Sequence, residues 1–222
     1  SLRRDIPTFD IVVGSFPITP LIPVFTVYSI TELKKQDQLS EAISLLQANQ
    51  FASAETAFSN LLENGETNPQ IHQHLAESQL HQQKFPEAID TLEAGLKIDP
   101  EKKELLTYLS QVFWGTGQRD RALTLHEKVV ELNPQDTQLI SNQASMHYEL
   151  NRKDDAVRMF ERILEAAPEA HQIHFSIGTI HLEENRYEDA INSFRNGLPN
   201  EPNNSYANKQ LGMALHISGA IK

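Results

Sequence analysis

Apolar residues recur at helical spacing along most of the chain, in segments separated by short polar or glycine-containing turns. In one such segment, Leu105, Leu109 and Val112 fall on the same helical face, as expected for a helix that packs on one side. Gly117 then interrupts the pattern, which resumes over residues 121–130. The chain therefore alternates helix, short turn and helix, and this alternation predicts an all-α protein.

The helical pattern repeats every 34 residues. One column of the repeat is always alanine, at Ala54, Ala88, Ala122, Ala156 and Ala190. A second column, twelve residues earlier in each unit, is always small: Ala42, Ala76, Ser110, Ala144, Gly178 and Gly212. Two antiparallel helices approach closely only where neither carries a bulky side chain, so the two columns predict the crossing point of a helix pair. One pair buries a single face, so neighbouring pairs must stack.

Turn residues define the units. Prolines that cannot continue a helix end the second helix of a unit, at Pro100, Pro134, Pro168 and Pro202. Residues that tolerate a positive φ are expected in the turn inside a unit, at Gly117, Asn151, Asn185 and Gly219. The resulting repeat domain, 35–222, has five complete units and a partial sixth: 35–68, 69–102, 103–136, 137–170, 171–204 and 205–222.

These columns resemble the tetratricopeptide repeat over residues 35–222. The resemblance also includes a mostly bulky column four residues after the alanines, at Phe58, Leu92, His126, Phe160 and Phe194. It implies a right-handed superhelical solenoid of antiparallel helix pairs that binds a protein or peptide partner. The motif is specific for the fold and does not identify the partner.

The resemblance also implies a binding surface, because the first helix of each pair lines the concave face in this family. Positions 2, 5, 6, 9, 12 and 13 of each unit lie nearest the ligand. From these positions we select as peptide-binding candidates Gln73, His74, Glu77, Tyr108, Gln111, Trp114, Ser141, Asn142, Ser145, Tyr148, Gln172, Phe175 and Thr179. Amides and hydroxyls can bond an extended backbone while the aromatic rings hold side chains. Packing between helices is the open alternative for Trp114 and Tyr148.

One family subtype is disfavoured. Members that bind the acidic C-terminus of heat-shock chaperones use a clamp of lysine, asparagine and arginine at concave positions. Here the corresponding residues are Leu39, Ile43, His74, Glu104 and Tyr108, which lack the required cations.

Residues 1–34 have a different character from the repeats. No charged residue occurs from Ile11 to Ile30, but Pro17, Pro20 and Pro23 disfavour a membrane-spanning helix. We predict an irregular, extended apolar segment that caps the first unit. It could instead occupy the groove of its own chain or of a second copy, as an autoinhibitor or a homodimerisation arm. A membrane anchor and the remnant of a preceding region stay open as alternatives.

Composition excludes several function classes. The formal net charge of −11 has the wrong sign for a protein that neutralises nucleic-acid phosphates. The absence of cysteine removes disulfides, cysteine zinc sites and thiol nucleophiles.

No catalytic or metal site is expected. His171, His174 and His181 could share one side of a helix, but no carboxylate joins them in a metal-binding signature. The sequence also lacks a G-x-S-x-G elbow, a P-loop and a G-x-G-x-x-G loop. We therefore expect no cofactor and no enzymatic activity.

The sequence thus predicts a noncatalytic protein–protein interaction module, an adaptor, scaffold or chaperone-like protein that binds an extended peptide. We expect it in the cytoplasm, with a membrane-associated or periplasmic location as the alternative. Two other functions stay open: the recognition domain of a longer transferase-type enzyme that continues past residue 222, and a membrane-tethered assembly factor anchored by residues 11–30.

Overall fold

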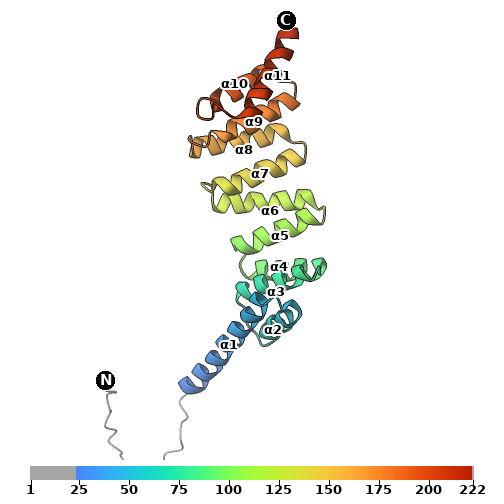
Figure 1. The fold of residues 1–222 in the computed structure, drawn as a ribbon. Coiled ribbons are helices and arrows are strands. Elements are labelled where there is room, and N and C mark those ends of the chain that lie inside the picture. The colour runs from blue at the N-terminus through green and yellow to red at the C-terminus, as the bar shows by residue number, and fades with distance from the viewer. Residues whose placement is uncertain (1–23, 222) are drawn as a thin grey trace, which may run out of the picture.

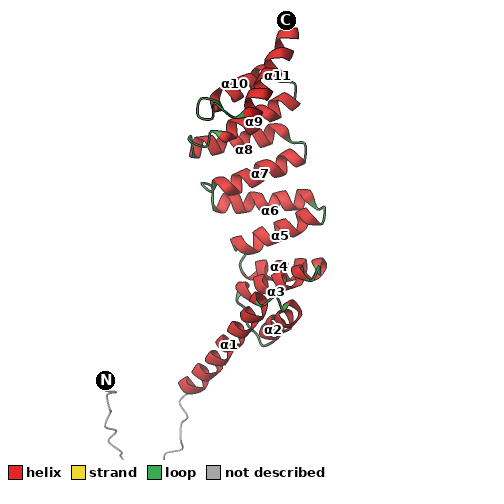
Figure 2. Cartoon of the chain, in the orientation of Figure 1, coloured by secondary structure: helices red, strands yellow, loops and turns green. Residues whose placement is uncertain are grey.

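The computed structural model describes the backbone of residues 24–221 and the side chains of residues 32–219. This part of the chain contains helices and connecting turns, without strands (Figure 2). The helices are α1 (Val24–Gln47), α2 (Phe51–Glu63), α3 (Pro69–His81), α4 (Phe85–Ile98), α5 (Lys103–Gly115), α6 (Arg119–Leu132), α7 (Thr137–Glu149), α8 (Lys153–Ala166), α9 (Gln172–Glu183), α10 (Tyr187–Gly197) and α11 (Ser205–Ile221).

The helices form consecutive antiparallel pairs that stack along one axis, from α1 at one end to α11 at the other (Figure 1). Each odd-numbered helix up to α9 packs against the even-numbered helix that follows, and each pair packs against the next. The buried apolar residues accordingly form a series of clusters along the stack, one of which joins α1, α2 and α3 and another α9, α10 and α11. Stability in such a solenoid comes from contacts between neighbours.

The two small-residue columns lie where the helices of a pair cross. All five alanines of the alanine column are fully buried, and the first five residues of the other small column are buried as well. Gly212, the sixth, is exposed on α11, the last helix that the structure describes. The predicted crossing point is therefore confirmed for the pairs from α1–α2 to α9–α10.

The turn inside each pair uses the left-handed backbone conformation. The same column has a positive φ in every complete unit, at Asn49, Gln83, Gly117, Asn151 and Asn185. Gly219 belongs to this column in the sequence but lies inside α11, so the turn expected there is absent. At the other end of units two to five the second helix stops before the proline, for example at Leu132 before Pro134, whereas unit one has Glu66 in that column.

Side-chain caps fix the start of three first helices, and at α11 the cap is Asn204, which accepts from the N–H of Ala207. The Asp136 carboxylate accepts hydrogen bonds from the backbone N–H groups of Gln138 and Leu139 at the start of α7. Asn68 caps α3 in the same way by accepting from the N–H of Gln70. Such caps satisfy N–H groups that have no partner within the helix.

The N-terminal segment differs from the prediction. Residues 24–34 were expected to be extended, but they form the first part of α1. The three prolines that suggested an extended backbone all precede Val24, and a proline before a helix does not interrupt its hydrogen bonds. Residues 1–23, which hold those prolines, lie outside the described residues, as do the capping and dimerisation roles predicted for them. Among the helices described, none is both long and apolar enough to cross a membrane.

Candidate peptide-binding groove

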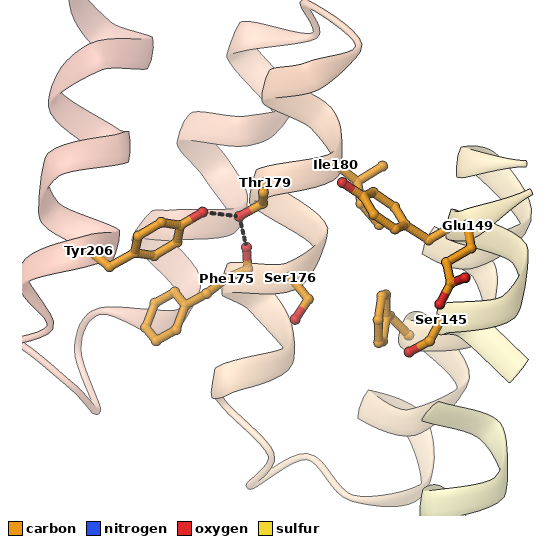
Figure 3. Close-up of a pocket in the computed structure, with 9 residues that line it drawn as sticks. Ser145, Glu149, Phe175, Ser176, Thr179, Ile180 and Tyr206 are labelled. Carbon is orange, nitrogen blue, oxygen red and sulfur yellow. Dashed lines mark hydrogen bonds between the residues drawn. The ribbon is translucent and has the colours of Figure 1, made fainter. Parts of the chain in front are cut away.

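A cavity of about 500 Å³ opens between the first helices of the last units. Ser145, Tyr148 and Glu149 line it from α7. On its opposite side, α9 contributes residues including Phe175 and Thr179, and α11 contributes Tyr206 (Figure 3). Phe160, Ser176 and Ile180 complete the lining. Cavities of this size, with apolar walls and a few polar groups, are typical of ligand-binding sites.

Hydroxyl groups organise the α9 side of the cavity. The Thr179 hydroxyl lies 2.8 Å from the backbone carbonyl of Phe175, to which it donates a hydrogen bond, and 3.1 Å from the Tyr206 hydroxyl (Figure 3). Tyr206 belongs to the following unit, so this contact joins α9 and α11 across the site. The tyrosine ring itself is half exposed and is available to a ligand.

Tyr148 is anchored on the α7 side. Its hydroxyl donates a 2.6 Å hydrogen bond to Glu183, whose carboxylate also lies 3.1 Å from the Lys153 ammonium group. The hydrogen bond to the carboxylate raises the pKa of Tyr148, and the same bond lowers the pKa of Glu183. Tyr148 therefore stays a neutral donor, with 38% of its surface exposed toward solvent.

The position of the Phe175 ring depends on Gly197, the last residue of α10. A Cβ atom added to Gly197 would lie 2.5 Å from Cε1 of Phe175, which is closer than carbon atoms pack. The same repeat column holds Val129 and Ile163 in the two preceding units. Glycine at this position therefore lets the Phe175 ring pack closely against α10.

A second group of predicted residues meets at the junction of α3 and α5. Burial and the nearby negative charge of Glu77 raise the pKa of Tyr108, an effect that the Gln73 side chain partly opposes. Tyr108 also packs against the core cluster between α3 and α6. This tyrosine is therefore part of the stack as well as of the predicted surface.

His74 lies beside the second group, with Nδ1 3.6 Å from a carboxylate oxygen of Glu77, and the other predicted residues belong to neither group. His74 stacks on Phe58, with 5.6 Å between ring centroids. Trp114 packs against the core and under the Arg119 guanidinium, whose carbon lies 4.6 Å from the ring centroid. The remaining residues lie on their helices without lining the cavity, and they are Gln111, Ser141, Asn142 and Gln172.

Some cavity residues were absent from the prediction. Glu149, Ser176 and Tyr206 stand at positions 13, 6 and 2 of their units, so the rule that selected the others would have found them. Phe160 and Ile180 could not be found in this way, because they stand at other positions of the repeat. Among the side chains of residues 32–219, no three acidic or histidine residues are grouped so that they could hold a metal ion.

Comparison with known families agrees with the architecture. The tetratricopeptide repeat model matches residues 39–103 and 141–205, together more than half of the chain. The chain belongs to the tetratricopeptide repeat family. No curated protein sequence matches it significantly.

Solved structures with the same fold include other tetratricopeptide repeat proteins. The crystal structure of MamA superposes with a TM-score of 0.64 at 15% identity, covering 76% of this chain and 92% of MamA. YrrB is described as a tetratricopeptide repeat protein with an unusual peptide-binding site. It superposes with a TM-score of 0.62 at 21% identity, covering 88% of this chain and 98% of YrrB. A tetratricopeptide repeat protein from Parabacteroides merdae superposes with a TM-score of 0.65 at 14% identity, covering 83% of this chain and 73% of that protein. At these identities the similarity shows the fold. Tetratricopeptide repeats are typically noncatalytic modules of protein–protein interaction, which favours a protein partner.

Proposed function

We propose that the protein is a noncatalytic adaptor or scaffold that binds an extended peptide segment along the first helices of its units. The cavity between α7, α9 and α11 is the anchor point for one large side chain of that segment. The observation that carries this proposal is the meeting of Tyr148, Phe175 and Tyr206 around one cavity with hydroxyl groups at its edge. Aromatic rings in pockets are frequent anchors of binding energy.

The polar groups of the same face suit an extended backbone. Ser145, Ser176 and Thr179 place hydroxyls beside the aromatic rings. The Ser145 and Thr179 hydroxyls donate to carbonyls of their own helices, and their oxygens can still accept hydrogen bonds from the N–H groups of an extended peptide. YrrB, which has the same fold, is described as having an unusual peptide-binding site, and this supports a peptide as the class of ligand.

The test is a titration of an array of synthetic peptides with one central residue varied on a neutral background of serine, threonine and glycine. We expect peptides with central Phe, Leu or Met to bind, as measured by fluorescence anisotropy, and peptides with central Ser to bind much more weakly. Replacing both Tyr148 and Tyr206 by alanine should weaken binding about tenfold or more. Circular dichroism should show unchanged helical content, since both side chains are exposed.

Phe85→Ala is the matched control. Phe85 is an aromatic residue of α4 that is 42% exposed and does not line the cavity. This variant should bind the peptides as the unmodified protein does. Absence of binding for every apolar central residue, or equal binding by the double tyrosine variant, would overturn the proposed function.

A further inference from the structure

The positions expected to face a ligand, which are positions 2, 5, 6, 9, 12 and 13 of each unit, carry acidic residues and almost no basic ones. In the five complete units, these positions contain no lysine or arginine, whereas Glu77, Glu104, Glu149 and Glu183 occur among them. In the partial sixth unit, position 5 is Lys209, which lies one turn after Tyr206 on α11. Among these positions, acidic residues therefore occur up to α9 and a basic residue only on α11. From outside these positions, Arg119 pairs with Glu149 and Lys153 with Glu183.

Glu149 is the acidic residue that lines the cavity itself. Its side chain is 51% exposed, and one carboxylate oxygen lies 2.8 Å from Nη1 of Arg119. Arg119 is itself 43% exposed and rests on the Trp114 ring. An exposed ion pair of this kind is weak, so a cation on a ligand can compete with Arg119 for the carboxylate.

Apolar and acidic groups are thus adjacent in one site. Phe160, Phe175 and Ile180 are almost fully buried and form apolar parts of the lining, with Glu149 on the α7 side. An apolar side chain that enters the cavity would itself leave water and would cover the exposed rings of Tyr148 and Tyr206. The residue next to it in an extended peptide would then pass close to the carboxylate.

We propose that the cavity selects a peptide in which a large apolar anchor residue is followed or preceded, on the α7 side, by lysine or arginine that pairs with Glu149. This inference rests on the proposed function and specifies the chemistry of its ligand. Complementary charge of this kind contributes specificity and speeds association. The net charge of −11 favours the same class of partner.

The experiment uses three sets of peptides with central Phe, in which the residues flanking it are arginine, its neutral isostere citrulline, or glutamate. We expect affinity to fall in that order, with roughly a fivefold preference for arginine over citrulline. The preference should shrink as the ionic strength rises. Glu149→Gln should abolish it, whereas Arg119→Gln, which frees the carboxylate, should increase it.

Glu93→Gln is the matched control for Glu149→Gln. Glu93 is also an exposed glutamate in an ion pair, 3.3 Å from Nη2 of Arg121, and it does not line the cavity. The control should keep the full preference for arginine. Equal affinity for arginine and citrulline peptides, or a preference that survives in Glu149→Gln, would overturn the inference while the proposed function stands. If no peptide with central Phe binds, the proposed function itself fails.

Discussion

The Ser110 hydroxyl on α5 donates a 2.8 Å hydrogen bond to the backbone carbonyl of Ala122 on α6. These two residues represent the two small-residue columns of the repeat, and both are buried. The bond shows how closely the helices of a pair approach, since a side chain of one reaches the main chain of the other. A larger residue at either position would separate the helices.

Ala122→Leu should destabilise the protein by overpacking this crossing. We expect the free energy of unfolding, measured by urea denaturation, to fall by about 1–3 kcal/mol. Ala52→Leu is the control, because Ala52 lies on the exposed side of α2 and leucine is nearly as good a helix former as alanine. Equal stability of Ala122→Leu and the unmodified protein would contradict the assigned crossing point.

Gly197→Ala should also lower stability, although alanine normally favours a helix over glycine by about 1 kcal/mol. The added Cβ would collide with the Phe175 ring and press it toward the cavity, so binding of apolar peptides should weaken as well. Gly115→Ala is the matched control: Gly115 also ends a helix, and its Cβ would meet no atom within 4 Å.

Phe175→Leu provides a second test of the same contact. If the ring causes the clash, Gly197→Ala should cost less stability in a Phe175→Leu background than in the unmodified protein. Thermal and urea denaturation of the four proteins in this double-mutant cycle measure the difference. An identical cost in both backgrounds would show that Phe175 is not the obstacle.

The two tyrosines of the predicted surface should respond differently to truncation. Tyr108 packs against core residues, so Tyr108→Ala should lower the melting temperature as well as affect binding. Tyr148 is exposed and held mainly by its bond to Glu183, so Tyr148→Ala should weaken peptide binding with a small change in melting temperature. A large loss of stability in Tyr148→Ala would mean that this residue belongs to the core.

Stability should fall in mild acid because several histidines are buried. Burial lowers the pKa of His147 below the ordinary value of 6.5, and Asp155, with Oδ2 3.8 Å from Nδ1, only partly opposes this effect. As the pH falls below 6.5, the unfolded chain takes up the proton before the folded protein does, so the free energy of unfolding decreases. Burial lowers the pKa of His72, His174 and His181 in the same direction.

His147→Phe tests this pH dependence. Unit three has Phe113 at the same position, where the ring is buried, so the fold accepts phenylalanine there. Urea denaturation at a series of pH values should show a shallower decline in stability for the variant than for the unmodified protein. A decline of the same slope would show that His147 does not contribute.

The fold could be predicted from the sequence because its information is local and repeated. The alanine column, the turn at Gly117 and the proline at Pro134 each specify local structure within one unit. Because the same features recur every 34 residues, each unit supports the prediction of a helix pair. The start of α1 was not predicted, because the prolines before Val24 suggested an extended chain. A proline does not prevent the residues that follow it from forming a helix with one another.

The sequence by itself therefore determined the repeat, the helix pairs and the crossing points, and it proposed a set of candidate peptide-binding positions. Only the tertiary structure decided which of those positions form a cavity. Tyr206 meets Thr179 across two helices, and Gly197 allows Phe175 to lie back against α10. Such contacts join residues from different helices and depend on how side chains fill the space between them, which no periodic pattern along one helix records.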